Sequence, residues 1–196
     1  MKEILAVIQV ILALIGITGY IIGTVKGKTK PNRVTWLMWA IAPLIGTAAA
    51  ISDGVTLAVV STFMAGFGPL LVFIASFVNK NSYWKLEKFD YICGLFSVLA
   101  LILWGVTKDP NVAIIFAIAS DFTAGFPTIK KAWTNPETEK ADPFITGIMA
   151  QTLTLFIITN WSFSSFAFPG YLFFFNIFLI YIILRPQINK LLFSKK

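Results

Sequence analysis

Seven long apolar runs divide this chain, and its lysine and arginine residues are sorted between the two ends of those runs. Each run is near the roughly 20 residues that a helix needs to cross the hydrocarbon core of a bilayer. Because backbone polar groups find no water partner in lipid, we expect every run to be helical. The sequence therefore predicts an all-α integral membrane protein with seven transmembrane helices. The runs cover residues 4–25, 34–51, 55–78, 89–106, 112–129, 144–161 and 166–184.

The apolar content of the chain argues against a soluble helical domain. Of its 196 residues, 57% are hydrophobic and only 13% are charged. A soluble domain of this size could not bury so much apolar surface, so we expect lipid to solvate the excess.

The basic residues give the chain a predicted orientation. Fourteen of the sixteen lie in segments at one side of the runs, and only Lys2 and Lys108 lie at the other. Under the positive-inside rule this predicts a multi-pass membrane protein with an outside amino terminus and a cytoplasmic carboxyl terminus. The basic segments would also attract anionic lipid headgroups. The charges are dispersed over four segments without a shared motif, which argues against nucleic acid as a partner.

A short internal repeat predicts how the runs are grouped. Residues 24–26 read Thr-Val-Lys and are followed by Pro31, while residues 128–130 read Thr-Ile-Lys and are followed by Pro136. Each copy ends the first helix of a three-helix unit. We expect a first repeat over 1–79, a linker helix over 80–107 and a second repeat over 108–196. One inserted helix keeps both units in the same orientation, so they would be parallel repeats in a 3+1+3 arrangement.

This arrangement resembles the PQ-loop superfamily, which includes the SWEET transporters. The stretch 126–133, Phe-Pro-Thr-Ile-Lys-Lys-Ala-Trp, is similar to the second PQ-loop, with Thr128 in place of the glutamine. In the first unit the equivalent pair is Gly23 and Thr24, so the signature proline is missing there. The stretch 28–39 is similar to a bacterial branch of the superfamily. The resemblance implies a transporter of the cytoplasmic (inner) membrane of a prokaryote that works by alternating access.

Three residues are candidate hinges. A proline inside a membrane helix removes one backbone hydrogen bond and bends the helix. Pro43 and Pro127 lie well inside runs, and Gly23 adds backbone freedom near the end of the first run. The alternative is that these are static kinks accommodated by packing.

Asp121 is the sharpest candidate for a functional residue. It lies near the middle of the fifth run, where an ionised carboxylate costs roughly 3 kcal/mol or more. No lysine or arginine lies at comparable depth in any run. We therefore expect Asp121 to line a solute pathway, where it would bind a proton or a cationic group of the solute. The alternative is a neutral acid that is hydrogen-bonded to a neighbouring helix.

Four further residues are candidate solute ligands. Asn176 lies halfway along the seventh run and resembles the substrate-contacting asparagine of SWEET proteins. Gln151 and Ser120 lie at similar depth, although a membrane serine often bonds its own helix backbone. Trp39 shares a helix face with Trp36 and could stack on a solute ring, or both could anchor the chain at the membrane interface.

Catalysis is not expected from this sequence. It has no histidine and a single cysteine, Cys93, so it lacks a usual base and a metal-ligand cluster, and no cofactor is implied. The predicted function is transport of a small polar or amine-bearing solute, with homo-oligomer formation left open. The alternative is a non-transporting receptor or assembly factor that uses the same cavity for a peptide or lipid.

Overall fold

The computed structural model describes residues 2–52, 58–107, 109–158 and 161–193, and every regular element in those ranges is helical. Each predicted run corresponds to one helix, although residues 55–57 of the third run and 159–160 of the sixth lie outside the described residues. Short 3₁₀ helices, Lys80–Ser82 and Pro136–Thr138, interrupt two of the connections. The α-helices are α1 (Lys2–Val25), α2 (Arg33–Ser52), α3 (Ala58–Ala75), α4 (Lys88–Val106), α5 (Pro110–Thr134), α6 (Asp142–Ile157) and α7 (Phe163–Phe193).

Local capping explains where two helices begin. The Asp109 carboxylate accepts hydrogen bonds from the backbone nitrogens of Asn111 (2.8 Å) and Val112 (3.2 Å), and Pro110 occupies the first turn of α5. At the start of α4, the backbone nitrogen of Glu87 donates to the carboxylate of Asp90 at 2.7 Å. These bonds satisfy donors that the first turn of a helix leaves free.

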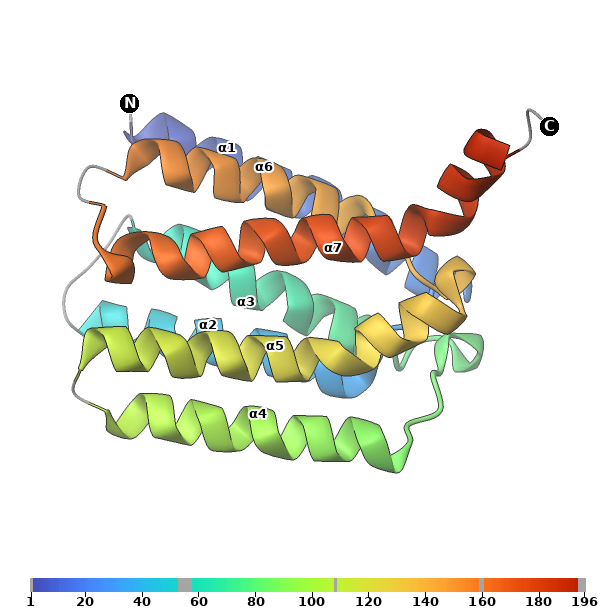
Figure 1. The fold of residues 1–196 in the computed structure, drawn as a ribbon, viewed down its shortest axis with the longest axis horizontal. Coiled ribbons are helices and arrows are strands. Elements are labelled where there is room, and N and C mark those ends of the chain that lie inside the picture. Colours follow the sequence, from blue (N-terminus) through green and yellow to red (C-terminus); the bar gives the residue numbers. More distant parts are fainter. Residues whose placement is uncertain (1, 53–57, 108, 159–160, 194–196) are drawn as a thin grey trace.

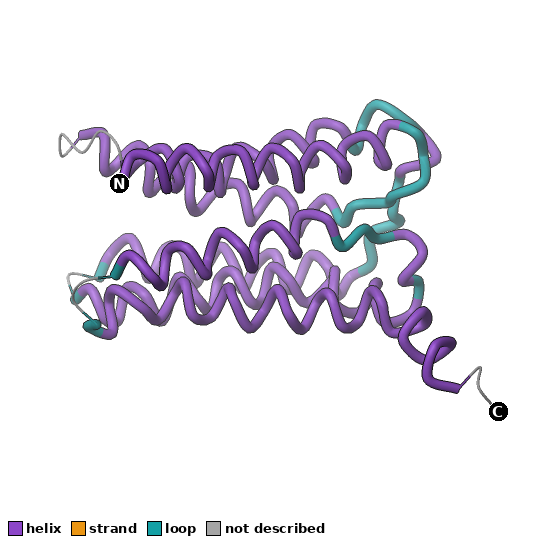
Figure 2. Tube along the Cα trace, turned by 90° about the horizontal axis from the view of Figure 1, so that it is seen from above, coloured by secondary structure: helices purple, strands orange, loops and turns teal. Residues whose placement is uncertain are grey.

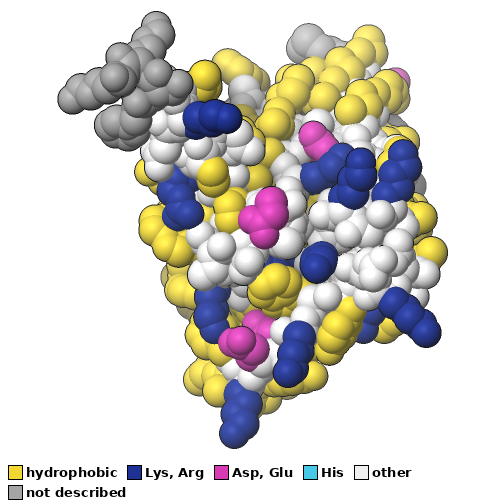
Figure 3. All heavy atoms as spheres, turned by 90° about the vertical axis from the view of Figure 1, so that its right-hand side faces the viewer, with side chains coloured by type: hydrophobic (Ala, Val, Ile, Leu, Met, Phe, Trp, Pro, Cys, Tyr) yellow, Lys and Arg dark blue, Asp and Glu magenta, His cyan; other side chains and the backbone are white. Residues whose placement is uncertain are grey.

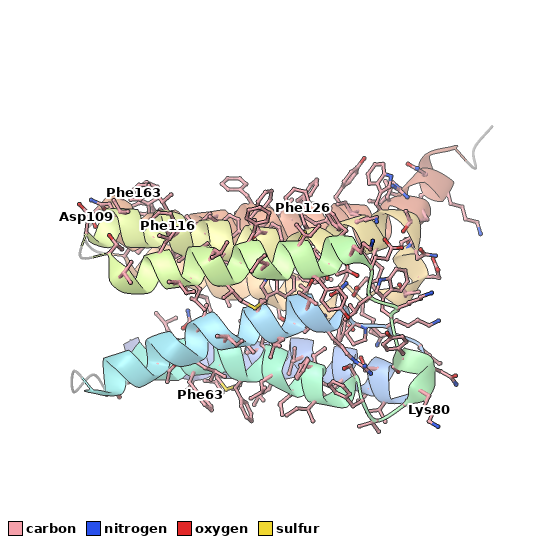
Figure 4. All side chains as sticks on the ribbon, turned by 90° about the horizontal axis from the view of Figure 1, so that it is seen from below. Phe63, Lys80, Asp109, Phe116, Phe126 and Phe163 are labelled. Atoms are coloured by element: carbon pink, nitrogen blue, oxygen red, sulfur yellow. The ribbon has the colours of Figure 1, made fainter. Side chains whose placement is uncertain are left out.

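The helices pack in two groups with matching internal contacts. In the first group α3 packs against both α1 and α2, and in the second α7 packs against both α5 and α6. The groups meet where α1 packs on α6 and α2 packs on α5, while α4 packs mainly on α5. Figure 4 shows α1, α2 and α3 in one layer and the remaining helices in the other.

Each group has a hydrophobic core of its own. The first core contains Ile17, Tyr20, Trp36 and Val72, all from the predicted first unit. The second is built from the predicted second unit and contains Ala132, Ala141, Phe144, Phe175, Leu179, Ile182 and Ile183. Trp39 packs against both cores and therefore lies where the two groups meet.

The basic segments lie together at one end of the molecule. The helices run lengthwise in Figure 1, and the connections after α1, α3 and α5 lie at its right-hand end, as does the carboxyl end of α7. Figure 2 shows these connections as teal loops, and Figure 3 looks onto this end and shows many lysine and arginine side chains. Lys80 lies at this end and Asp109 at the other (Figure 4). Lys108, Lys195 and Lys196 lie outside the described residues.

Large apolar side chains cover much of the outer surface. On α4 alone, Tyr91, Leu95 and Phe96 are each more than half exposed, and Phe174 on α7 is 70% exposed. By length and hydropathy, two stretches are long and apolar enough to cross a membrane, Glu3–Val25 and Phe166–Leu191. The chain is thus an all-helical protein with two such helices in its described part, and the seven spans remain a prediction.

Candidate functional site

A cavity of about 500 Å³ lies where the two helix groups meet. All seven helices contribute to it, α4 through Leu101 alone. On α1 and α5 its lining comes from residues 9–17 and 114–121, so it extends from the middle of the bundle toward the end opposite the basic loops. Its polar side chains, apart from two tryptophans, are Gln9, Asp121, Thr146, Gln151, Thr154 and Asn176.

Asp121 lines this cavity and is also hydrogen-bonded to a neighbouring helix. The Tyr171 hydroxyl donates to its Oδ2 at 2.8 Å. The indole nitrogen of Trp39 donates to the backbone oxygen of Asp121 at 3.2 Å. No lysine or arginine occurs among the described residues that line the cavity, so Asp121 has no cationic partner there. Asp121 thus borders the cavity and is bonded to another helix, while its contact with a solute and its protonation remain predictions.

Asn176 on α7 and Gln151 on α6 both line the cavity, and these two helices pack against each other. Asn176 packs closely against Gly147, where an added methyl group would lie 2.7 Å from the amide nitrogen of Asn176. The Gln9 amide nitrogen reaches across from α1 and donates to the Thr154 hydroxyl at 2.9 Å. The predicted ligands Asp121, Asn176 and Gln151 are therefore brought together around one space.

Trp39 lies in the cavity wall among other aromatic rings. Its ring meets those of Phe144 and Phe175 edge to face, at centroid separations of 6.2 and 6.1 Å. Trp36 is buried against Tyr20, with ring centroids 4.6 Å apart. The interpretation of the two tryptophans as interfacial anchors is therefore wrong for Trp36, which is 2% exposed.

Ser120 does not belong to the cavity lining, which corrects the prediction made for it. Its hydroxyl lies 2.9 Å from that of Ser97 on α4 and donates to the Ser97 backbone oxygen at 3.0 Å. Successive residues on an α-helix point about 100° apart. Because Asp121 faces the cavity, the side chain of Ser120 faces α4 instead.

The three candidate hinges have different surroundings. Pro43 lies within α2 and lines the cavity, and Pro127 lies within α5, whose carboxyl-terminal part bends away from the bundle axis in Figure 1. At Gly23 an added methyl group would collide with the Thr29 hydroxyl and lie 3.0 Å from Cε of Lys140. Close packing therefore accounts for this glycine, and its role as a hinge remains a prediction.

A buried polar cluster, which we call the polar plug, closes the basic end of the bundle. It consists of Tyr20, Lys131 and Glu139. The Tyr20 hydroxyl donates to Oε2 of Glu139 at 2.6 Å, and the Lys131 ammonium pairs with Oε1 of Glu139. The same ammonium donates to the backbone oxygen of Lys30. The side chains of Lys131 and Glu139 are 1% and 0% exposed.

Sequence reasoning missed the polar plug because both of its charges lie in a segment expected to be solvated. Helical periodicity offered one usable signal. Ala124, Thr128 and Lys131 follow the spacing i, i+4, i+7, which places them on one face of α5, and all three are buried. A lysine on the buried face of a helix requires a partner.

Further bonds between the two groups reinforce closure at the basic end. The Thr35 hydroxyl donates to the backbone oxygen of Ala124 at 2.6 Å. The backbone nitrogen of Lys30 donates to the backbone oxygen of Thr138 at 2.9 Å. The Lys140 ammonium donates to the backbone oxygen of Gly19 at 3.0 Å. The cavity is thus separated from the basic loops by several bonded contacts.

Comparisons with known proteins leave function to be inferred from this site. No family model matches the chain, and neither a curated protein nor a solved structure matches it. Among the described residues, no group of three or more histidine, cysteine or acidic side chains could hold a metal ion. Because fold alone does not determine function, the cavity and its closure are the informative features.

Proposed function

We propose that this protein is a seven-helix membrane transporter of the PQ-loop and SWEET type. In this proposal the units 1–79 and 108–196 rock about the central cavity, so that a small solute reaches it from either side of the membrane in turn. The observation that carries the proposal is a cavity between two helix groups, closed at one end by the polar plug. Asp121, Asn176 and Gln151 would contact the solute, or a coupled proton in the case of Asp121.

The exposed apolar surface and the charge distribution support a multi-pass membrane protein. Exposed Leu95 and Phe96 on α4 lie between loops that carry the positive charge and an opposite end that carries little of it. Lipid would solvate such a surface, and the positive-inside rule would place the basic end in the cytoplasm. The described conformation would then be closed toward the cytoplasm.

The packing pattern supports two parallel repeats. The contacts of α3 with α1 and α2 correspond to those of α7 with α5 and α6, and the contact of α1 with α6 corresponds to that of α5 with α2. Exchanging the two units leaves this set of contacts unchanged. A pseudo-twofold axis along the membrane normal would produce the same relation.

Accessibility of a cavity residue from both faces tests the proposal without knowledge of the solute. Gln151→Cys would be introduced into a Cys93→Ser background, since Cys93 is the only native cysteine. A membrane-impermeant maleimide would be applied to right-side-out and to inside-out vesicles. A transporter predicts labelling of Gln151→Cys in both preparations, because each face opens in turn.

Two control positions calibrate this experiment. Glu137→Cys, at an exposed position in the 3₁₀ helix between α5 and α6, should react only in inside-out vesicles. Leu95→Cys, on the exposed apolar face of α4, should react in neither. If Gln151→Cys reacts from one face only, the transporter proposal fails and the non-transporting receptor is supported.

A further inference from the structure

The cavity offers one carboxylate, several aromatic rings and no positive charge. Asp121 is the acidic residue in its lining, and no lysine or arginine joins it among the described lining residues. Most of the remaining lining is aliphatic or aromatic. A single carboxylate in a mainly apolar lining limits which solutes the proposed transporter could accept.

One oxygen of the Asp121 carboxylate is available to a ligand. Tyr171 donates to Oδ2, and no described residue of the chain is seen to donate a hydrogen bond to Oδ1. A carboxylate can accept several hydrogen bonds, so a donor on the solute could complete the set. A cationic donor forms the stronger bond and offsets the cost of holding the charge in a low-dielectric site.

Aromatic rings lie immediately beside this carboxylate. Tyr171 stacks on Phe175 with ring centroids 5.4 Å apart, and Trp39 meets Phe175 edge to face at 6.1 Å. Ring faces attract ammonium groups, and the same rings provide apolar area for an organic body. Carboxylate and rings together form a site for a cation with an apolar body.

We propose that the solute is a small organic amine with an apolar or aromatic body and no anionic group. This inference rests on the proposed function, in that it takes the central cavity as the solute site. An amino acid would bring its own carboxylate next to Asp121 without a lysine or arginine to receive it. A sugar carries no cation and would leave the Asp121 carboxylate without a charged partner.

Matched ligands test this proposal on the purified protein in detergent. The probes are 2-phenylethylamine, tryptamine and hexylamine, each compared with its corresponding alcohol, together with phenylalanine and tryptophan. Binding would be measured by titration calorimetry and by the shift in thermal unfolding midpoint. We expect at least one amine to bind at least tenfold more tightly than its alcohol and its amino acid. The proposal is overturned if no amine binds, or if the alcohols or amino acids bind as tightly.

Two variants test whether Asp121 causes the preference for an amine over its alcohol. Asp121→Asn keeps an oxygen that can accept from Tyr171 but removes the charge, so it should abolish the tenfold preference for amine over alcohol. Glu137→Gln likewise replaces a carboxylate by an amide, at an exposed position in the 3₁₀ helix between α5 and α6, and should keep the preference for amine over alcohol. A preference that survives in Asp121→Asn would also overturn the proposal. The comparison of ligands on the unaltered protein decides the question even if Asp121→Asn does not fold.

Failure of this inference can be distinguished from failure of the proposed function. If Gln151→Cys is labelled from both faces but no amine binds, transport stands and the solute class is wrong. If an amine binds but labelling occurs from one face only, the solute class stands and the protein is a receptor.

Discussion

The Tyr20 hydroxyl and the Glu139 carboxylate, 119 residues apart in the chain, are joined by a hydrogen bond of 2.6 Å. Tyr20 comes from α1, and Glu139 lies in the connection between α5 and α6. The bond therefore ties the two helix groups together at the basic end, beside the ion pair that Glu139 makes with Lys131. If the groups move apart during transport, this bond has to break.

Tyr20→Phe tests whether that bond holds the basic end closed. The substitution removes the hydroxyl and keeps the ring that packs on Trp36. Loss of a hydrogen bond to a charged group costs about 1.5–3 kcal/mol, so the closed conformation should become less populated. We expect faster labelling of Gln151→Cys in inside-out vesicles and unchanged or slower labelling in right-side-out vesicles. Equal rates in the two proteins would show that the bond does not contribute to closure.

The ion pair of Lys131 and Glu139 should behave as a coupled unit. Lys131→Met or Glu139→Gln alone leaves a buried charge without its partner, which typically costs about 3–5 kcal/mol in free energy of unfolding. The double variant should cost less than the sum of the single variants, because no unpaired charge remains. Thermal or denaturant unfolding of the four proteins in detergent measures this coupling.

A surface ion pair provides the control for this double-mutant cycle of Lys131 and Glu139. Lys130 and Glu87 are 2.8 Å apart, with both side chains more than half exposed. Exposed pairs contribute little because water and salt screen them. The corresponding cycle of Lys130→Met and Glu87→Gln should show a much smaller coupling than the buried pair. Coupling of equal size in the two cycles would contradict the assignment of the buried pair as the structural link.

The same surface pair should give a small pH dependence of stability. The hydrogen bond from Lys130, together with its charge, holds the pKa of the Glu87 carboxyl below its ordinary value of 4.5. A carboxyl whose pKa is lowered by folding stabilises the folded state above its ordinary pKa, and this contribution is lost as pH falls through the lowered pKa. The unfolding midpoints of the parent protein and Glu87→Gln should therefore converge below pH 4.5. A difference that grows on acidification would contradict this cause.

The apolar runs and the depth of residues along them predicted the helices more fully than they predicted which side chains line the cavity. Apolar runs and capping residues such as Asp109 locate helices because both depend on local sequence. Depth along a run also placed Asp121 near the middle of α5, but depth does not determine which way a side chain points. Ser120 lies at the same depth and faces α4, because helix rotation depends on tertiary packing.

The polar plug was not predictable from charge counts. The positive-inside rule treats Lys131 as one of several solvated loop charges, although its side chain is buried against Glu139. The pairing depends on how the connection between α5 and α6 folds back over α1, which brings Glu139 to Tyr20. Contacts between segments so distant in sequence follow from the packing of whole helices.

Gly147→Ala tests whether the position of Asn176 matters for the cavity. The new methyl group would lie 2.7 Å from the amide nitrogen of Asn176, so that side chain has to move within the cavity wall. The displaced amide is the end of a side chain that borders the cavity, so we expect only a modest drop in the unfolding midpoint, together with weaker binding of the amine probes.

Gly105→Ala on α4 is the matched control, because nothing lies within 4 Å of the added methyl group. It should be neutral or stabilising, since alanine favours helix over glycine by about 1 kcal/mol. In an Asn176→Ala background Gly147→Ala should lose most of its cost, because the colliding amide is gone. A full cost in that background would mean that the strain arises elsewhere and that Asn176 does not determine the shape of this wall.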